Sequence, residues 1–220
     1  MIEFVISAVL LLNEKGVIVK KVSWLFIFFV VLIWSAISPK DRLTWWLEVF
    51  PALAALVVLV VTYRRFPLTP LLYGLILFHC IILMVGGHYT YAEVPLFGHI
   101  SEWLDWPRNN FDKLAHFIQG FVPAIAVREV VIRHEVFNSH SWRNFFCVCF
   151  CLALSAFYEL IEWWAALLGD SSAEAFLGTQ GYVWDTQSDM GLALLGAILA
   201  LVILGRCHDR QLVNFRSLSS

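Results

Sequence analysis

Six long apolar stretches recur along this 220-residue chain, and they constrain its fold more than any other feature. They cover residues 22–38, 46–63, 70–87, 112–132, 144–168 and 189–205. A helix that crosses a bilayer needs about 20 mostly apolar residues. Each stretch has roughly that length, so the sequence predicts an all-α, polytopic transmembrane helical bundle with about six spans.

The composition agrees with this prediction. Hydrophobic residues make up 60% of the chain and charged residues 15%, with a mean hydropathy of +0.75, whereas soluble domains are about half apolar and a quarter charged. We therefore expect a transmembrane domain over residues 22–205. It would be preceded by a cytoplasmic or interfacial segment, residues 1–21, and followed by a cytoplasmic tail, residues 206–220.

The distribution of lysine and arginine predicts the orientation of the spans. With six spans, eleven of the 15 basic residues fall on the side that holds both termini, and the loop 169–188 on the other side has none. Cytoplasmic loops carry the excess of basic residues in membrane proteins. We therefore expect both termini in the cytoplasm and the loops 88–110 and 169–188 outside.

This orientation places the most unusual polar residues at one depth, toward the outer face. Three spans contribute acidic residues and a histidine there, and residues four apart, such as Asp112 and His116, share a helix face. Carboxylates within the hydrocarbon are costly and are candidates for function. The candidate catalytic residues are Asp112, His116, Glu159, Glu162, Asp185 and Asp189.

The two outer loops and the start of the fourth span supply candidate substrate-binding residues, which are His88, Glu93, Arg108, Lys113 and Gln180. A connection as long as 88–110 is often functional. Within it, GHISEWLDWP (98–107) is expected to form a short amphipathic helix at the membrane interface, with Trp103 and Trp106 facing lipid.

Several kinds of chemistry fit this set of residues. His116, Glu159, Glu162 and Asp189 are candidate ligands for a divalent metal ion, which would polarise a phosphoryl or carbonyl oxygen or activate water. Without metal, one glutamate protonated in its apolar setting would act as a general acid or base with His116 as its proton partner. The same carboxylates also suit a cation or proton relay. Each residue has a structural alternative as a helix cap, a snorkelling cation or a packing histidine.

Familiar soluble-enzyme motifs are absent from the sequence. There is no HExxH, P-loop, GxSxG or GxGxxG, and DTQSDMG lacks the glycine and glutamate of a calcium loop. No basic patch accompanies the aromatic residues, so nucleic acid is excluded as a partner. Membrane lipid is the expected partner.

Four segments, DKLAHFIQGF, YELIEWW, LGTQGYVWDTQSDM and GGHYTYAEVPLF, resemble the YjdF family of bacterial inner-membrane proteins. The resemblance covers nearly the whole chain and implies a multi-pass protein of the inner membrane, with no substrate attached.

A shorter pattern, DKxxHF with a glutamate in the next span and an aspartate at the start of the last, is similar to VanZ-like proteins. These are linked to glycopeptide (teicoplanin) resistance. That similarity puts forward Asp112, His116, Glu159 or Glu162, and Asp189. The arginine that precedes the last aspartate in the VanZ-type pattern is not evident in GYVWD, residues 181–185.

The sequence leads to one main hypothesis and two alternatives. The main hypothesis is an outward-facing site that handles an envelope lipid or a lipid-linked headgroup, by metal-assisted or acid/base chemistry. The alternatives are a small ion- or proton-coupled transporter and a non-catalytic subunit of a membrane complex.

Overall fold

The computed structural model describes residues 21–168 and 182–217, and these residues form an all-helical bundle. Five helices are long and apolar enough to cross a membrane. They are α2 (Arg42–Thr62), α3 (Pro70–Tyr89), α5 (Phe111–Arg133), α6 (His140–Leu168) and α8 (Asp185–Ser217). A further apolar helix, Lys21–Ala36, covers most of the first predicted span, 22–38. The prediction of a polytopic helical bundle is therefore confirmed.

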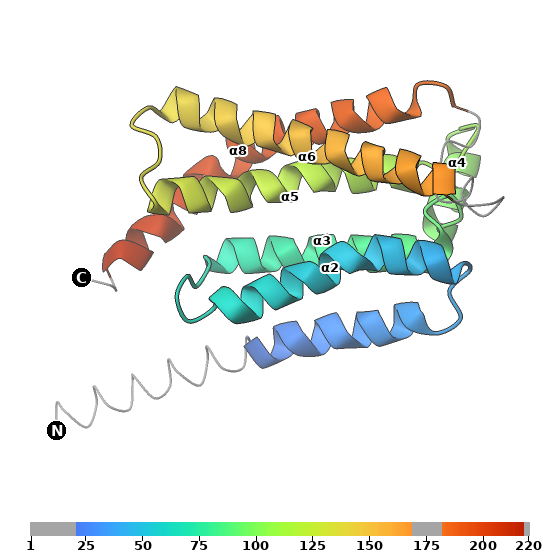
Figure 1. The fold of residues 1–220 in the computed structure, drawn as a ribbon, viewed down its shortest axis with the longest axis horizontal. Coiled ribbons are helices and arrows are strands. Elements are labelled where there is room, and N and C mark those ends of the chain that lie inside the picture. Colours follow the sequence, from blue (N-terminus) through green and yellow to red (C-terminus); the bar gives the residue numbers. More distant parts are fainter. Residues whose placement is uncertain (1–20, 169–181, 218–220) are drawn as a thin grey trace.

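The long helices lie in two layers (Figure 1). One layer holds the helix Lys21–Ala36 with α2 and α3, and the other holds α5, α6 and α8. The short helix α4 (Pro95–Trp103) lies at one end of the bundle. We call this the outer end, because the excess of basic residues at the opposite, inner end predicts that the inner end faces the cytoplasm. The start of the helix Lys21–Ala36 and the C-terminal part of α8 lie at the inner end.

Local sequence signals set the helix boundaries. The Asp41 side chain accepts a hydrogen bond of 2.7 Å from the backbone N–H of Thr44 and caps α2. Thr69 caps α3, and Pro70, which has no N–H to satisfy, takes its first position. Thr90 ends the same helix in the left-handed conformation, with φ of 61°.

Small residues bring α5 and α8 into backbone contact, and the two helices run in the same direction (Figure 1). A Cβ on Gly120 would collide with the carbonyl of Ala193, and a Cβ on Gly196 would collide with the carbonyl of Phe117. Such close approach is typical of helices that pack inside a bilayer. It fixes the position of α5 relative to α8, and these two helices carry most of the polar residues considered below.

The remaining interior is apolar, and so is much of the outside. Buried residues such as Phe28, Trp45 and Met84 fill the space between the helix Lys21–Ala36, α2 and α3. Large apolar side chains, including Val61 and Phe145, are exposed on the outward faces of α2 and α6. An apolar exterior is what helices surrounded by lipid require.

Two elements differ in extent from their predicted ranges. The interfacial helix expected over 98–107 is present as α4, which begins at Pro95 and ends at Trp103, and both Trp103 and Trp106 are exposed. The last span, expected over 189–205, is longer at both ends, since α8 begins at Asp185 and continues to Ser217. Helix α8 therefore continues into the range that was expected to be a tail, because residues 206–217 include few helix breakers.

Candidate functional site

His116 lies at the centre of a buried polar cluster at the outer end, which we call the outer cluster. Helix α5 supplies Asp112 and His116, α6 supplies Glu159 and Glu162, and α8 supplies Asp189. The Nε2 atom of His116 is 3.4 Å from an Asp112 carboxylate oxygen, and Nδ1 is 3.8 Å from Glu159. The imidazole ring therefore has a carboxylate on each side.

The outer cluster contains two overlapping sets of possible metal ligands. In one set, Asp112, His116 and Asp189 each offer a ligand atom, and these atoms lie within 4.8 Å of one another. The second set, His116 with Glu159 and Glu162, meets the same limit. All four residues expected as metal ligands thus lie together, and Asp112 joins them.

A glutamine bears on the protonation of His116. The side-chain oxygen of Gln119 is 3.0 Å from Nδ1 of the imidazole, one turn along the same helix. The neutral imidazole ring carries one proton. If that proton is on Nδ1 and is donated to Gln119, Nε2 has no proton and faces the Asp112 carboxylate as an acceptor. Two acceptors at that distance repel each other, so either a proton or a metal ion has to lie between them.

Glu48 extends the outer cluster toward the other layer of helices. This α2 residue is only 5% exposed and accepts a 3.0 Å hydrogen bond from the Tyr158 hydroxyl of α6. The Tyr91 hydroxyl is a second donor to it, and burial, reinforced by the Glu48 charge, raises the pKa of Tyr91 so that it stays protonated. Sequence reasoning did not select Glu48, although a carboxylate inside an apolar span was a signal for it.

Asp185 is close to the outer cluster but has a different partner. It forms a buried ion pair with Arg108, which lies in the segment that leads from α4 into α5. Asp185 begins α8, one turn before Asp189. The ion pair therefore holds the segment between α4 and α5 next to the outer cluster. Of the candidate binding residues, Arg108 is thus adjacent to the candidate catalytic ones.

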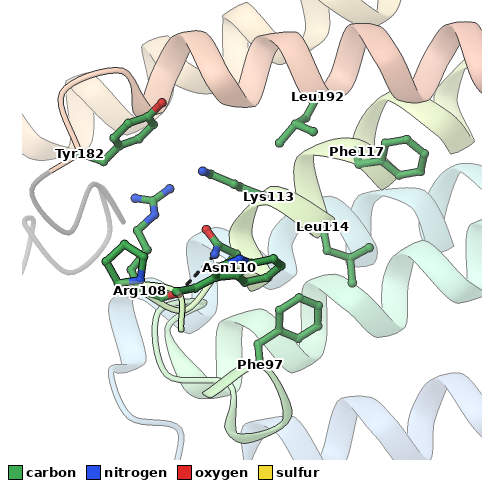
Figure 2. A pocket seen from close by; sticks show the side chains of 10 residues that line it. Phe97, Arg108, Asn110, Lys113, Leu114, Phe117, Tyr182 and Leu192 are labelled. Atoms are coloured by element: carbon green, nitrogen blue, oxygen red, sulfur yellow. Dashed lines mark hydrogen bonds between the residues drawn. The ribbon is translucent and has the colours of Figure 1, made fainter. Parts of the chain in front are cut away.

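A cavity of about 810 Å³ opens beside this ion pair (Figure 2). Arg108 and Lys113 both line it, and the ring of Tyr182 lies 5.0 Å from the Arg108 guanidinium and 4.8 Å from the Lys113 ammonium. Phe97, Leu114 and Leu192 make up part of its apolar wall. Lys113 therefore lies on the cavity side of α5, while the preceding residue, Asp112, contacts His116.

The other candidate binding residues lie elsewhere. His88 hydrogen-bonds the backbone carbonyl of Ser35 at 3.0 Å and packs its ring against Trp34. Glu93 forms an exposed ion pair with Lys40. No contact within residues 21–168 and 182–217 joins either of them to the outer cluster. Gln180 lies outside the described residues.

A second buried polar cluster lies at the inner end, and we call it the inner cluster. At its centre is Glu129 of α5, which is fully buried and accepts hydrogen bonds from the backbone and hydroxyl of Thr69, at 3.0 and 2.7 Å. His208 of α8 is 3.0 Å from the same carboxylate, and Arg133 is 3.1 Å from it. These contacts join the start of α3 to α5 and α8.

Arg128 completes the inner cluster. Its guanidinium donates to Nδ1 of His208 at 2.9 Å and pairs with Asp209 at 2.7 Å. Because Nδ1 of His208 accepts this bond, Nε2 carries the proton that is donated to Glu129. Sequence analysis placed His208 and Asp209 in a tail, since it ended the last span at residue 205.

The two clusters differ in charge balance. In the inner cluster, arginines and a histidine accompany Glu129 and Asp209. In the outer cluster, four carboxylates surround His116, and one oxygen each of Glu159 and Asp189 is buried without a hydrogen-bond partner among the described residues. A buried negative charge is stable only when it is paired, protonated or bound to a cation. The outer cluster therefore has an excess of buried carboxylates, whereas the charged groups of the inner cluster are paired with one another.

The long apolar helices define a multi-pass helical membrane protein, and the comparisons with known proteins identify its membrane as the bacterial inner membrane. Residues 20–210 match a family described as predicted membrane protein DUF2238, and the chain belongs to that family. It is 53% identical over 185 residues to the inner membrane protein YjdF of Escherichia coli (strain K12), a match that covers 84% of this chain and 88% of the relative.

The resemblance to the YjdF family is thus confirmed, whereas the shorter one to VanZ-like proteins stays a prediction. No solved structure matches the chain.

Proposed function

We propose that the outer cluster binds a divalent metal ion and that this site acts on the headgroup of an envelope lipid or a lipid-linked molecule. The observation that carries the proposal is the pair of ligand sets that share His116, each with its donor atoms within 4.8 Å. The unpartnered oxygens of Asp189 and Glu159 supply the second argument, because each residue belongs to one of the two ligand sets and a cation bound in that set would satisfy its oxygen.

The distances are compatible with a metal site after small adjustments. Around a tetrahedral zinc ion with bonds of about 2.1 Å, ligand atoms lie about 3.4 Å apart. Donor atoms within 4.8 Å of one another reach such an arrangement by side-chain rotation of about an ångström. Histidine nitrogen combined with carboxylate oxygen suits zinc or manganese better than calcium, which prefers oxygen ligands alone.

The two ligand sets suggest a division of roles. A metal held by Asp112, His116 and Asp189 would polarise a phosphoryl or carbonyl oxygen of the headgroup, or activate a water molecule. Glu159 and Glu162 on the opposite side of His116 would then serve as general base and acid. In a metal-free version, a proton on His116 takes the place of the cation and the same glutamates carry the acid/base chemistry.

Metal analysis of purified protein tests the proposal. Wild-type protein in detergent would be equilibrated with zinc, manganese or magnesium, freed of excess metal, and measured by inductively coupled plasma mass spectrometry. We expect stoichiometric retention by the wild type. His116→Ala removes a ligand from both sets, so its affinity should fall by more than the 10- to 100-fold that is typical of losing an outer-shell partner.

Two further variants make the test specific. Asp189→Asn keeps the size of the side chain and should weaken binding, whereas His99→Ala should not, because His99 is an exposed histidine at the same end of the molecule. Absence of metal from the wild type would leave only the acid/base version. Unchanged envelope-stress phenotypes in both His116→Ala and Glu159→Gln would refute that version too.

A second candidate function, ion- or proton-coupled transport, is favoured by one observation. The same two helices, α5 and α8, carry a charged cluster at each end of the bundle. Against it stands the close contact of Gly120 with Ala193 between the clusters, where small and apolar side chains fill the interface. Proteoliposomes loaded with a pH-sensitive dye would decide this, since a transporter should move protons down a gradient and the Glu159→Gln variant, which removes an outer-cluster carboxylate, should not.

A further inference from the structure

The cavity beside the outer cluster combines cationic and apolar walls in an order that matches a lipid. Figure 2 shows Arg108 and Lys113 extending toward Tyr182 on one side, with Phe97, Leu114 and Leu192 on the other. With a volume of about 810 Å³, it falls within the usual range of small-molecule sites. A ligand that fits has a compact negative group and an apolar chain.

The charge in this cavity centres on Lys113. Arg108 is paired with Asp185, but no carboxylate of residues 21–168 and 182–217 lies within ion-pair distance of the Lys113 ammonium, whose contact is with the face of Tyr182. A lysine held by a ring rather than by a carboxylate keeps its hydrogen-bonding capacity for an anion. Lys113 also lies in the first turn of α5, and lysines near the ends of membrane helices extend toward the headgroup region.

From this geometry we infer that the cavity seats a glycerophospholipid, with its phosphodiester on Lys113 and Arg108 and an acyl chain along Phe97, Leu114 and Leu192. The phosphate is the group recognised, and the apolar wall distinguishes a lipid from a free phosphate. This inference names the substrate class of the proposed function and in that sense rests on it.

The position of the cavity connects it to the outer cluster. Asp112 precedes Lys113 in α5 and contacts His116, and Asp185 links Arg108 to the helix that carries Asp189. A phosphodiester bound by Lys113 therefore lies next to the cluster residues without displacing any of them. No residue of the outer cluster lines the cavity, so the cavity places the headgroup beside the cluster, on the neighbouring face of α5.

Native mass spectrometry tests the inference directly. Purified protein would be titrated with dioleoyl phosphatidylglycerol in detergent containing EDTA, so that lipid binding is measured without metal. Lys113→Gln should weaken binding about tenfold or more, which is the expected effect of losing a charge-assisted hydrogen bond. Lys40→Gln is the matched control, since Lys40 is an exposed lysine at the same end of the bundle that pairs with Glu93.

Inorganic phosphate and glycerol phosphate form the other arms of the titration. Two results together support the inference. The wild type binds the lipid but neither soluble phosphate, and Lys113→Gln binds the lipid more weakly while unfolding at the same temperature as the wild type. Equal lipid affinity of Lys113→Gln and Lys40→Gln would overturn it, and so would glycerol phosphate binding as tightly as the lipid. If the wild type binds the lipid in EDTA but retains no metal in the metal analysis, the metal site is refuted and the lipid site is not.

Discussion

Replacement of Glu129 by glutamine removes one negative charge from the inner cluster and keeps the size of the side chain. Each carboxylate oxygen of Glu129 has at least two donors: Thr69 N–H and Arg133 reach one, and the Thr69 hydroxyl and His208 reach the other. In glutamine, one of these oxygens becomes an NH2 group, which cannot accept from either of its donors.

The size of the effect depends on which oxygen is replaced. If the NH2 group faces the Thr69 hydroxyl and His208, the hydroxyl can rotate to accept, but Nδ1 of His208 already accepts from Arg128. At least one charge-assisted hydrogen bond is therefore lost, and Arg133 loses the carboxylate that it pairs with. We expect the free energy of unfolding to fall by about 2 to 5 kcal/mol.

Unfolding of the detergent-solubilised protein, followed through its ten tryptophans, measures this loss. Glu102→Gln is the matched control, because Glu102 is an exposed glutamate whose contact with the exposed His99 is 3.8 Å long. It should change stability by less than about 0.5 kcal/mol. If Glu129→Gln were as stable as Glu102→Gln, the inner cluster would not hold the bundle together and our account of it would be wrong.

Two further predictions concern packing and capping. Gly120→Ala should destabilise the bundle by about 1 to 3 kcal/mol, because the new Cβ meets the Ala193 carbonyl. Gly74→Ala is the control and should have little effect, because there is open space around Gly74. An equal effect of the two substitutions in thermal unfolding would contradict the close contact. Asp41→Ala should cost about 1 kcal/mol. The hydrogen bond from the Thr44 N–H lowers the pKa of Asp41 below its ordinary value of 3.8. The stability that this cap adds is therefore present above pH 3.8 and is lost as the pH falls through the lowered pKa. Unfolding measured at several pH values would detect the loss.

The fold was largely predictable because lipid imposes a simple rule on sequence. Apolar length alone located each of the five long helices, with most boundaries within a few residues of those observed. The end of α8 was missed because hydropathy measures only the part of a helix inside the bilayer. Residues 206–217 are polar but continue the helix into the inner cluster.

The outer cluster was predictable in part. The spacing of Asp112 and His116 and of Glu159 and Glu162 indicated shared helix faces, and the assumed orientation placed all three spans at one depth. His88 and Glu93 were included on position in a loop alone, and their contacts are with Ser35 and Lys40. Distances between helices depend on packing, which one sequence does not reveal, so Glu48 and the partnership of Glu129 with His208 required the structure.

The crossing of α5 and α8 has a mechanical consequence. Backbone contact at Gly120 and Gly196 leaves no side chains between the two helices at that level, near the middle of α5. The same two helices carry residues of both clusters. The contact therefore holds Asp112 close to Asp189 at one end and Arg128 close to His208 at the other.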